Sequence, residues 1–123
     1  MRLLVCGDRN WTNRELIREK ILDLKKSLDE YSESLVIIEG EANGADLMAR
    51  SVAEELGLQF VPFPADWNRF HKAAGPIRNS QMLIEGQPHQ VFAFHNDLAH
   101  SRGTKDMVTK AQKVGLPVEI YTE

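Results

Sequence analysis

The sequence predicts a three-layer α/β sandwich built on a five-stranded parallel sheet. Short apolar runs of strand length alternate along the chain with amphipathic helical patterns, as they do in successive βαβ units. The runs also differ in composition, which separates central strands from edge strands. Capping signals stand where the helical patterns begin and end. Together these observations favour one sheet with helices on both faces.

Five runs rich in Val, Ile or Phe mark the strands, and they are Leu3–Cys6, Leu35–Ile38, Phe60–Phe63, Val91–Phe94 and Val118–Tyr121. The first, second and fourth contain neither Pro nor charge, as strands buried on both faces require. The third contains Pro62, and the fifth follows Pro117 and contains Glu119. Pro and charge are tolerated at sheet edges. The strand order 3-2-1-4-5 puts these two runs at the edges, and it is a Rossmann-like order.

Three apolar stripes with helical spacing lie between the strands. They comprise Ile17, Ile21, Leu24 and Leu28; Ala45, Met48, Ala49, Val52, Ala53 and Leu56; and Met107, Val108, Ala111 and Val114. A shorter helix is expected over Pro76–Glu85, with Pro at its first position. Thr12–Glu15 is typical of a capping box, and Asn43 of an N-cap. Gly57 and Gly115 stand where helix C-caps belong.

Length and composition favour a single domain over residues 1–123. The chain is 42% hydrophobic and 27% charged, as globular proteins are. Its net charge of −3 argues against a general nucleic-acid-binding surface. No apolar run approaches the ~20 residues that span a bilayer, and no signal peptide opens the sequence. We therefore expect a cytoplasmic protein without a membrane partner.

The sequence specifies no metal site. A single Cys excludes an intrachain disulfide and a Cys-based zinc cluster, and the four His residues form no ligand set. No firm cofactor follows, and Mg²⁺ has no residue pattern of its own to support it. Exposed strand edges in a small domain are compatible with a homodimer.

Ligands of such sheets bind beyond the carboxyl ends of the strands, where the strand order reverses. That point lies between the first and fourth strands, so the loops Gly7–Asn10 and His95–Thr104 face each other. Gly7 permits close approach of a ligand, Arg9 can pair with a phosphate, and Trp11 can stack on a base. The alternative is an ordinary βα turn with a half-buried Trp.

The loop after the fourth strand carries hydroxyls and a cation just before a helix. Ser101, Arg102, Gly103 and Thr104 could hold one phosphate through backbone N–H groups, two hydroxyls and the guanidinium. The alternative is a Ser or Thr N-cap beside a solvated Arg. We favour the phosphate interpretation because this loop faces the first loop across the switch point.

The loop after the second strand combines glycines with carboxylates. Gly40 and Gly44 stand around a helix start and can form a phosphate-binding nest. Glu39 and Asp46 argue against several bare phosphates there and suit ribose hydroxyls, or a metal, better. The alternative is a capped helix without a ligand.

The segment from Pro64 to Gly75 is irregular, aromatic and basic, and such stretches in compact domains are usually functional. Trp67 can stack on a base, and Lys72 adds a cation. Arg78 and Asn79 are expected in the first turn of the following helix, where a cation is disfavoured unless it has an anionic partner. The alternative is a surface loop packed by its own aromatic side chains.

Five segments, in this order along nearly the whole chain, resemble one family. They are Gly7-Asp8-Arg9, Gly40–Asp46, Pro64–Trp67, Ala74–Met82 and Ser101–Met107. Together they resemble the SLOG superfamily, and most closely its YspA-like, cpYpsA-related branch. The resemblance implies a Rossmann-like fold that binds a nucleotide or nucleotide-derived ligand such as ADP-ribose, NAD or AMP. It also implies a role, such as that of a sensor, in a stress or phage-related system of bacteria or their phages.

A more distant resemblance links the chain to the Lonely-Guy phosphoribohydrolases, which hydrolyse the N-glycosidic bond of nucleoside monophosphates. Arg78–Met82 resembles their Arg-Lys-x-x-Met helix start, with Asn in place of Lys. His100–Met107 keeps the Gly-Thr of their second motif but lacks the paired glycines and retains one acid. In this alternative Arg78 orients the phosphate or base, and Asp106 or Glu39 assists bond cleavage.

A second alternative is single-stranded DNA binding. It follows from the resemblance to DNA-processing protein A, another member of the superfamily. The net acidity and the lack of a basic run argue against it, because such binding depends on a positively charged groove.

Overall fold

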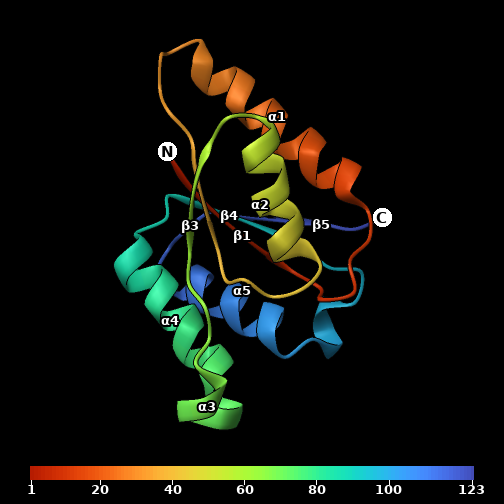
Figure 1. Ribbon diagram of the computed structural model, residues 1–123, viewed down its shortest axis with the longest axis vertical. Helices are drawn as coiled ribbons and strands as arrows, with labels where there is room; N and C mark the ends of the chain where they lie inside the picture. The colour runs from red at the N-terminus through yellow and green to blue at the C-terminus, as the bar shows by residue number, and fades with distance from the viewer.

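The computed structural model describes residues 1–123 and confirms a five-stranded parallel sheet between two helical layers (Figure 1). The strands are β1 (Arg2–Gly7), β2 (Val36–Glu39), β3 (Gln59–Pro62), β4 (Gln90–Phe94) and β5 (Val118–Tyr121). The helices are α1 (Arg14–Asp29), α2 (Ala45–Glu55), α3 (Trp67–Phe70), α4 (Ala74–Gly86) and α5 (Gly103–Lys113). The strand order is β3-β2-β1-β4-β5, as the sequence predicts. None of the helices is long and apolar enough to cross a membrane.

The two helical layers bury opposite faces of the central strands. Along β1, Leu3 and Val5 belong to the hydrophobic cluster that includes α1 and α2. Leu4 and Cys6 belong to the cluster that includes α4 and α5. This division follows from the alternation of side chains along a strand. The apolar stripes of the helices supply the rest of both clusters.

The edge strands β3 and β5 contain the proline and the charged residue that a central strand would exclude. Pro62 is the last residue of β3, and Glu119 lies exposed in β5. The central strands β1, β2 and β4 consist almost entirely of buried residues. The composition of the strands therefore predicted their positions correctly.

The register of the sheet brings two loops together. Gly7 of β1 pairs with Phe94 of β4 at the carboxyl ends of these strands. The next residues, Asp8 and His95, therefore leave the sheet side by side. The backbone N–H of Asp8 also donates a hydrogen bond to the Phe94 carbonyl at 2.9 Å. The expected switch point is thus formed by the ends of β1 and β4.

The first two long helices begin differently from the prediction. Asn13, rather than Thr12, caps α1, because its side chain accepts a hydrogen bond from the Leu16 N–H at 3.1 Å. Gly44, rather than Asn43, is the N-cap of α2. Its φ of 76° is a left-handed conformation that favours glycine.

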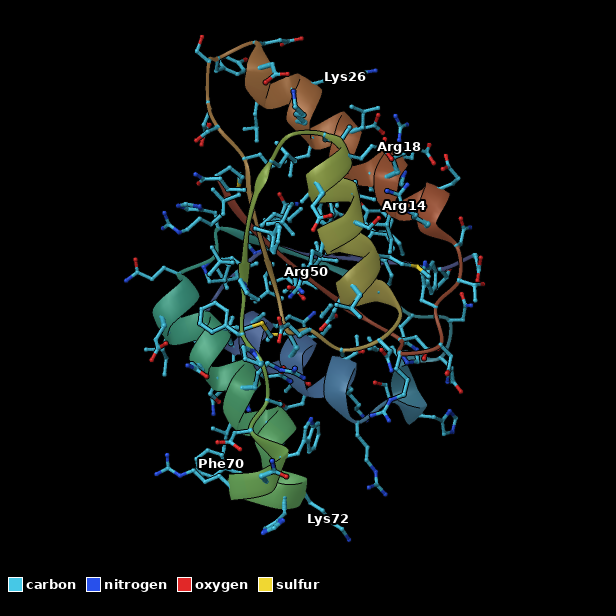
Figure 2. The ribbon with its side chains drawn as sticks, in the orientation of Figure 1. Arg14, Arg18, Lys26, Arg50, Phe70 and Lys72 are labelled. Carbon is cyan, nitrogen blue, oxygen red and sulfur yellow. The ribbon has the colours of Figure 1, made fainter.

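The start of α4 also differs. The irregular, aromatic segment contains the short helix α3 and a 3₁₀ turn over His71–Ala73, which leads directly into α4 at Ala74. Pro76 is therefore not the first helical residue, and Arg78 lies beyond the first turn. Figure 2 shows Phe70 and Lys72 at the end of the molecule that α3 forms.

Candidate functional site

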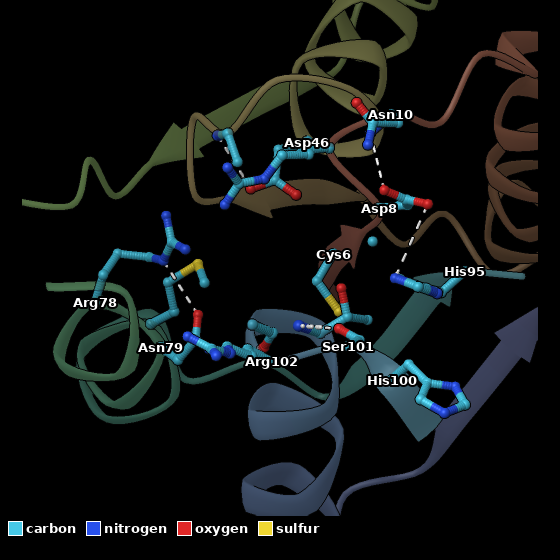
Figure 3. A pocket seen from close by; sticks show the side chains of 16 residues that line it. Cys6, Asp8, Asn10, Asp46, Arg78, Asn79, His95, His100, Ser101 and Arg102 are labelled. Carbon is cyan, nitrogen blue, oxygen red and sulfur yellow. Dashed lines mark hydrogen bonds and ion pairs between the residues drawn. The ribbon is translucent and has the colours of Figure 1, made fainter. Parts of the chain in front are cut away.

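A pocket of about 390 Å³ opens at the carboxyl ends of β1 and β4 (Figure 3). Its walls come from the loops after β1, β2 and β4 and from the first half of α4. A second pocket of about 570 Å³ adjoins it and extends toward the loop before α3. The residues that line both pockets are Arg9, Ala42, Arg78, Arg102 and Gly103. The two pockets therefore form one continuous concave surface.

Two glycines allow the loops around the first pocket to approach each other closely. A Cβ at Gly7 would lie 2.4 Å from the Phe94 carbonyl oxygen and 2.7 Å from the Ala45 Cβ. A Cβ at Gly44 would lie 2.3 Å from the Asp8 carbonyl oxygen. The loop after β1 and the start of α2 can therefore pack only with glycine at both positions. Gly7 lines the first pocket, whereas Gly44 lies outside it and packs against the backbone of Asp8 and Arg9.

Three arginines from different elements converge on the pockets. Arg78 of α4 donates through Nη1 to the Gly40 carbonyl at 2.6 Å and through Nε to the Asn79 side chain at 3.1 Å. These bonds fix its guanidinium at the pocket wall. Arg9 and Arg102 are exposed, and neither side chain has an acceptor within the chain. Two of the three cations are thus free to bind an anion.

The start of α5 presents unsatisfied donors beside these arginines. The Ser101 hydroxyl accepts hydrogen bonds from the N–H groups of Thr104 and Lys105, at 3.1 and 3.3 Å. The N–H groups of Arg102 and Gly103 donate to no atom of the chain. Ser101 therefore acts as a helix cap, while two backbone donors stay open in the manner of anion sites at helix N-termini.

Asn79 connects α4 to the start of α5. It is 3% exposed, and its Nδ2 donates to the Gly103 carbonyl at 3.1 Å and to the Asp106 carboxylate at 3.0 Å. Its Oδ1 accepts from Arg78. Asn79 thus positions both the guanidinium of Arg78 and the N-terminus of α5 around the pocket.

Asp46 is a buried carboxyl in the first pocket, in the first turn of α2. It is 4% exposed, and its Oδ2 accepts hydrogen bonds from the N–H groups of Gly40 and Ala42, at 3.1 and 3.2 Å. Burial raises the pKa of Asp46 to about 7, although the Arg78 guanidinium opposes the shift. The side chain shapes the loop after β2 and adds a titratable group to the pocket.

Glu39, expected to meet ribose or to assist catalysis, lines neither pocket. Its side chain is fully buried and accepts a hydrogen bond from Nε of Arg50 at 3.0 Å and another from the Glu41 N–H at 2.6 Å. Burial raises the pKa of Glu39, and Arg50 opposes the shift. Arg50 lies on α2 (Figure 2), and its side chain is partly exposed. Glu39 holds the fold of this loop.

Asp106 likewise lines neither pocket. Its carboxylate lies 3.0 Å from Nζ of Lys110 and accepts the hydrogen bond from Asn79. Both partners stabilise its charge in the first turn of α5. The structure therefore gives Asp106 a positioning role and does not bring it to a ligand in either pocket.

The two tryptophans occupy opposite environments. Trp11 is 3% exposed, packs edge-on against Phe94, and donates through Nε1 to the Asn13 carbonyl at 2.9 Å. Trp11 lines neither pocket, so the structure does not bring this expected stacking residue to them. Trp67 is 54% exposed and lines the second pocket with Lys72. Trp67 is therefore the tryptophan that presents its ring to a pocket.

Four further residues with polar side chains line the first pocket, and no sequence motif marks them as ligand-binding: they are Cys6, Asn10, His95 and His100. Their positions at the end of β1 or in the loops after β1 and β4 are the one feature of the sequence that could have indicated them. Burial raises the pKa of the Cys6 thiol, so this group stays neutral. No group of three or more His, Cys, Asp or Glu side chains has the arrangement of a metal site.

Comparison with known proteins assigns the family. The family model described as the YspA, cpYpsA-related SLOG family matches residues 1–70. The chain belongs to this SLOG family. A curated relative, the gene 61 protein of Mycobacterium phage D29, is 34% identical over 122 residues, which cover 95% of this chain and 93% of the relative.

A solved structure shows the same SLOG fold. DNA processing protein A (DprA) from Streptococcus pneumoniae superposes with a TM-score of 0.74 over 97% of this chain, at 18% sequence identity. The chain spans about half the length of that protein, since the match covers 49% of it. At this identity the likeness shows the fold alone.

Proposed function

We propose that the chain binds a nucleotide or a nucleotide-derived small molecule, of the AMP, ADP-ribose or NAD type, at the carboxyl edge of its sheet. One observation carries the proposal. Three arginines from three separate elements line a continuous pair of pockets beside the open N–H groups of α5, and two of them have no acceptor in the chain. Membership of the SLOG family supports a nucleotide-related function.

The phosphate is proposed to bind where the arginines meet the start of α5. A guanidinium gives charge-assisted hydrogen bonds to phosphate oxygens, and helix N-termini favour anions. Arg102 supplies both a side chain and a backbone N–H, and Gly103 adds a second N–H. Arg78 is fixed in place by its bonds to Gly40 and Asn79, which lowers the entropy lost on binding.

The base is proposed to bind in the second pocket. That pocket is more apolar, and Trp67 offers an exposed aromatic surface there, with Lys72 nearby. Base–aromatic stacking contributes about 1–3 kcal/mol. The combined pockets are large enough for a dinucleotide-type ligand as well as a mononucleotide. The phage relative supports a phage-related system as the setting for this binding, and a sensor role in that system is part of the proposal.

The test combines a thermal-shift panel with calorimetry. AMP, ADP-ribose and NAD are added to the purified protein, and adenosine serves as the ligand that lacks phosphate. A ligand at a hundredfold excess over its Kd should stabilise the protein by about 2.7 kcal/mol, which raises the Tm by several degrees. If none of the phosphate-bearing ligands raises the Tm, the proposal is wrong.

The variant Arg102→Gln tests the phosphate subsite directly. Because the Arg102 side chain has no partner in the chain, its loss should leave the fold intact. We expect binding of AMP to weaken by about 1.5–3 kcal/mol, the value of a charge-assisted hydrogen bond, while binding of adenosine stays unchanged. Lys113→Gln, an exposed change in the last turn of the same helix, is the matched control. An equal loss of AMP affinity in both variants would indicate a general effect of net charge instead of a phosphate subsite at Arg102.

The hydrolase alternative receives less support from the geometry. It relies on Glu39 and Asp106, and both carboxylates are engaged with cations outside the pockets. Incubation with nucleoside monophosphates and NAD, followed by detection of free base, tests it. The DNA-binding alternative is tested by retention on single-stranded DNA at physiological salt.

A further inference from the structure

Two groups of polar side chains lie on opposite sides of Cys6 in the first pocket (Figure 3). The cationic group comprises Arg78, Asn79 and Arg102. The other group comprises Asp8, Asn10 and His95. The proposed phosphate belongs with the cationic group, because the Asp8 carboxylate would repel it on the other side. The second group therefore faces a different part of the ligand.

Asp8 and His95 leave a gap that matches one small polar group. Oδ2 of Asp8 lies 4.0 Å from Nε2 of His95, which is too far for a direct hydrogen bond. Both side chains are partly exposed, and both line the pocket. An oxygen atom placed about 2.8 Å from each would bond to both.

The donor and acceptor roles in this gap are fixed. The backbone N–H of Asp97 donates to Nδ1 of His95 at 2.9 Å. Nδ1 thus keeps its lone pair, so the neutral ring carries its proton on Nε2. Oδ1 of Asp8 accepts from the N–H of Asn10 at 2.9 Å, which leaves Oδ2 as an open acceptor. The gap therefore has a donor on one side and an acceptor on the other.

We infer that Asp8 and His95 form a subsite for a sugar hydroxyl, which accepts a hydrogen bond from Nε2 of His95 and donates one to Oδ2 of Asp8. A hydroxyl fits because it both accepts and donates. A phosphate oxygen only accepts, and an ammonium only donates, so each leaves one partner unmatched. The inference rests on the proposed nucleotide binding and narrows the ligand to a ribose phosphate, as opposed to a deoxyribose phosphate or a simple anion.

The other carboxylates near the pockets differ from Asp8 in their surroundings, since Asp46 faces the Arg78 guanidinium on the cationic side and the remaining two pair with a cation. Glu39 and Glu41 both pair with Arg50, and Oδ2 of Asp46 accepts two backbone N–H groups. The subsite is also rigid, because Asp8 and His95 directly follow the paired residues at the ends of β1 and β4. Rigid placement of both partners favours discrimination between a ligand that has the hydroxyl and one that lacks it.

Calorimetry with AMP, 2′-deoxy-AMP and 3′-deoxy-AMP tests the subsite in the wild-type protein. At least one deoxy ligand should bind roughly tenfold more weakly than AMP, because removal of the hydroxyl leaves two polar groups unmatched. Ribose 5-phosphate and 2-deoxyribose 5-phosphate repeat the comparison without a base. Equal binding of AMP and both deoxy ligands would overturn the subsite and leave the proposed nucleotide binding intact.

Variants of Asp8 and His95 test whether these two residues cause the difference in affinity between AMP and its deoxy analogues. In Asp8→Asn, which preserves the acceptor for the Asn10 N–H, and in His95→Phe, AMP and the deoxy ligands should bind within about twofold of each other. His95→Gln retains a donor near the Nε2 position and should keep part of the discrimination. Asp23→Asn, an exposed charge change outside both pockets, is the control.

The outcomes separate the two proposals. If both Asp8→Asn and His95→Phe keep the wild-type discrimination, the hydroxyl lies elsewhere and the inference is wrong. If none of the nucleotides binds the wild-type protein, the proposed function fails and the subsite fails with it. The deoxy-ligand comparison in the wild-type protein needs no variant, so a variant that fails to fold does not prevent the test.

Discussion

Asp46 is a buried titratable residue of the first pocket whose pKa is shifted toward neutral pH. Burial raises its pKa from 3.8 to about 7, so the folded protein holds a proton that the unfolded chain releases at lower pH. Between these two values the folded state binds more protons than the unfolded state. The contribution of Asp46 to stability therefore falls as the pH rises through this window.

The variant Asp46→Asn should remove this dependence. The Asn side-chain oxygen can still accept the N–H groups of Gly40 and Ala42, so the loop keeps its shape. Relative to the variant, the wild-type protein should lose up to about 4 kcal/mol in its free energy of unfolding from about pH 4 to about pH 8, at about 1.36 kcal/mol per pKa unit. Urea unfolding of both proteins across this range measures it. A difference that is constant with pH would show that Asp46 does not titrate there.

At the scale of elements, the approach of α2 to the loop after β1 depends on Gly44. This residue has a φ of 76°, and an added Cβ would lie 2.3 Å from the Asp8 carbonyl oxygen. Gly57 offers a matched comparison, because it has a φ of 69° but no atom within 4 Å of an added Cβ. Both glycines adopt a left-handed backbone conformation, but only at Gly44 would an added Cβ collide with another part of the chain.

Alanine substitution at both glycines separates the two effects. Gly57→Ala should destabilise the protein by roughly 1 kcal/mol, from the left-handed conformation alone. Gly44→Ala should destabilise it by about 1–3 kcal/mol more, because the loop after β1 must move. It should also weaken AMP binding, since Arg9 follows in that loop. Thermal unfolding and calorimetry measure both effects, and equal losses in the two variants would contradict this account.

The elements themselves could be predicted because their signals are local. Strand length, apolar spacing and glycine at the helix ends depend on neighbouring residues only, and Gly57 and Gly115 follow their helices as expected. Strand order could be predicted from Pro62 and Glu119 because edges tolerate what central strands exclude. Arg102 was singled out because its loop stands at the switch point, and Arg78 because a cation near the start of a helix is disfavoured without an anionic partner.

Burial of individual site residues could not be predicted in the same way. Trp11 packs on Phe94, which lies in a strand far along the chain, and Glu39 is neutralised by Arg50 from the next helix. Such contacts exist only after the layers assemble, so no local pattern reports them. The loop that begins at His95 was placed correctly opposite the loop after β1, but the 4.0 Å approach of the His95 ring to Asp8 depends on side-chain orientation, which no local pattern reports.

At the scale of the whole molecule, the sheet couples the two helical layers. Adjacent residues of β1 point into opposite clusters, Leu3 and Val5 toward α1 and α2, and Leu4 toward α4 and α5. Unfolding of either helical layer alone would expose one apolar face of the central strands to water. We therefore expect residues 1–123 to unfold as one cooperative unit, as a single domain of this size does.

A core truncation in one layer, observed from the other, tests this coupling. Trp67→Phe leaves Trp11 as the only Trp, and Trp11 reports on the layer of α1 and α2. In that background, Met107→Ala removes a fully buried side chain from the opposite layer and should destabilise the protein by about 2–5 kcal/mol. Because the layers share the sheet, the urea midpoint reported by Trp11 fluorescence should fall by the same amount as the midpoint reported by far-UV circular dichroism. A fluorescence midpoint that stays in place while the dichroism midpoint falls would show that the two layers unfold independently.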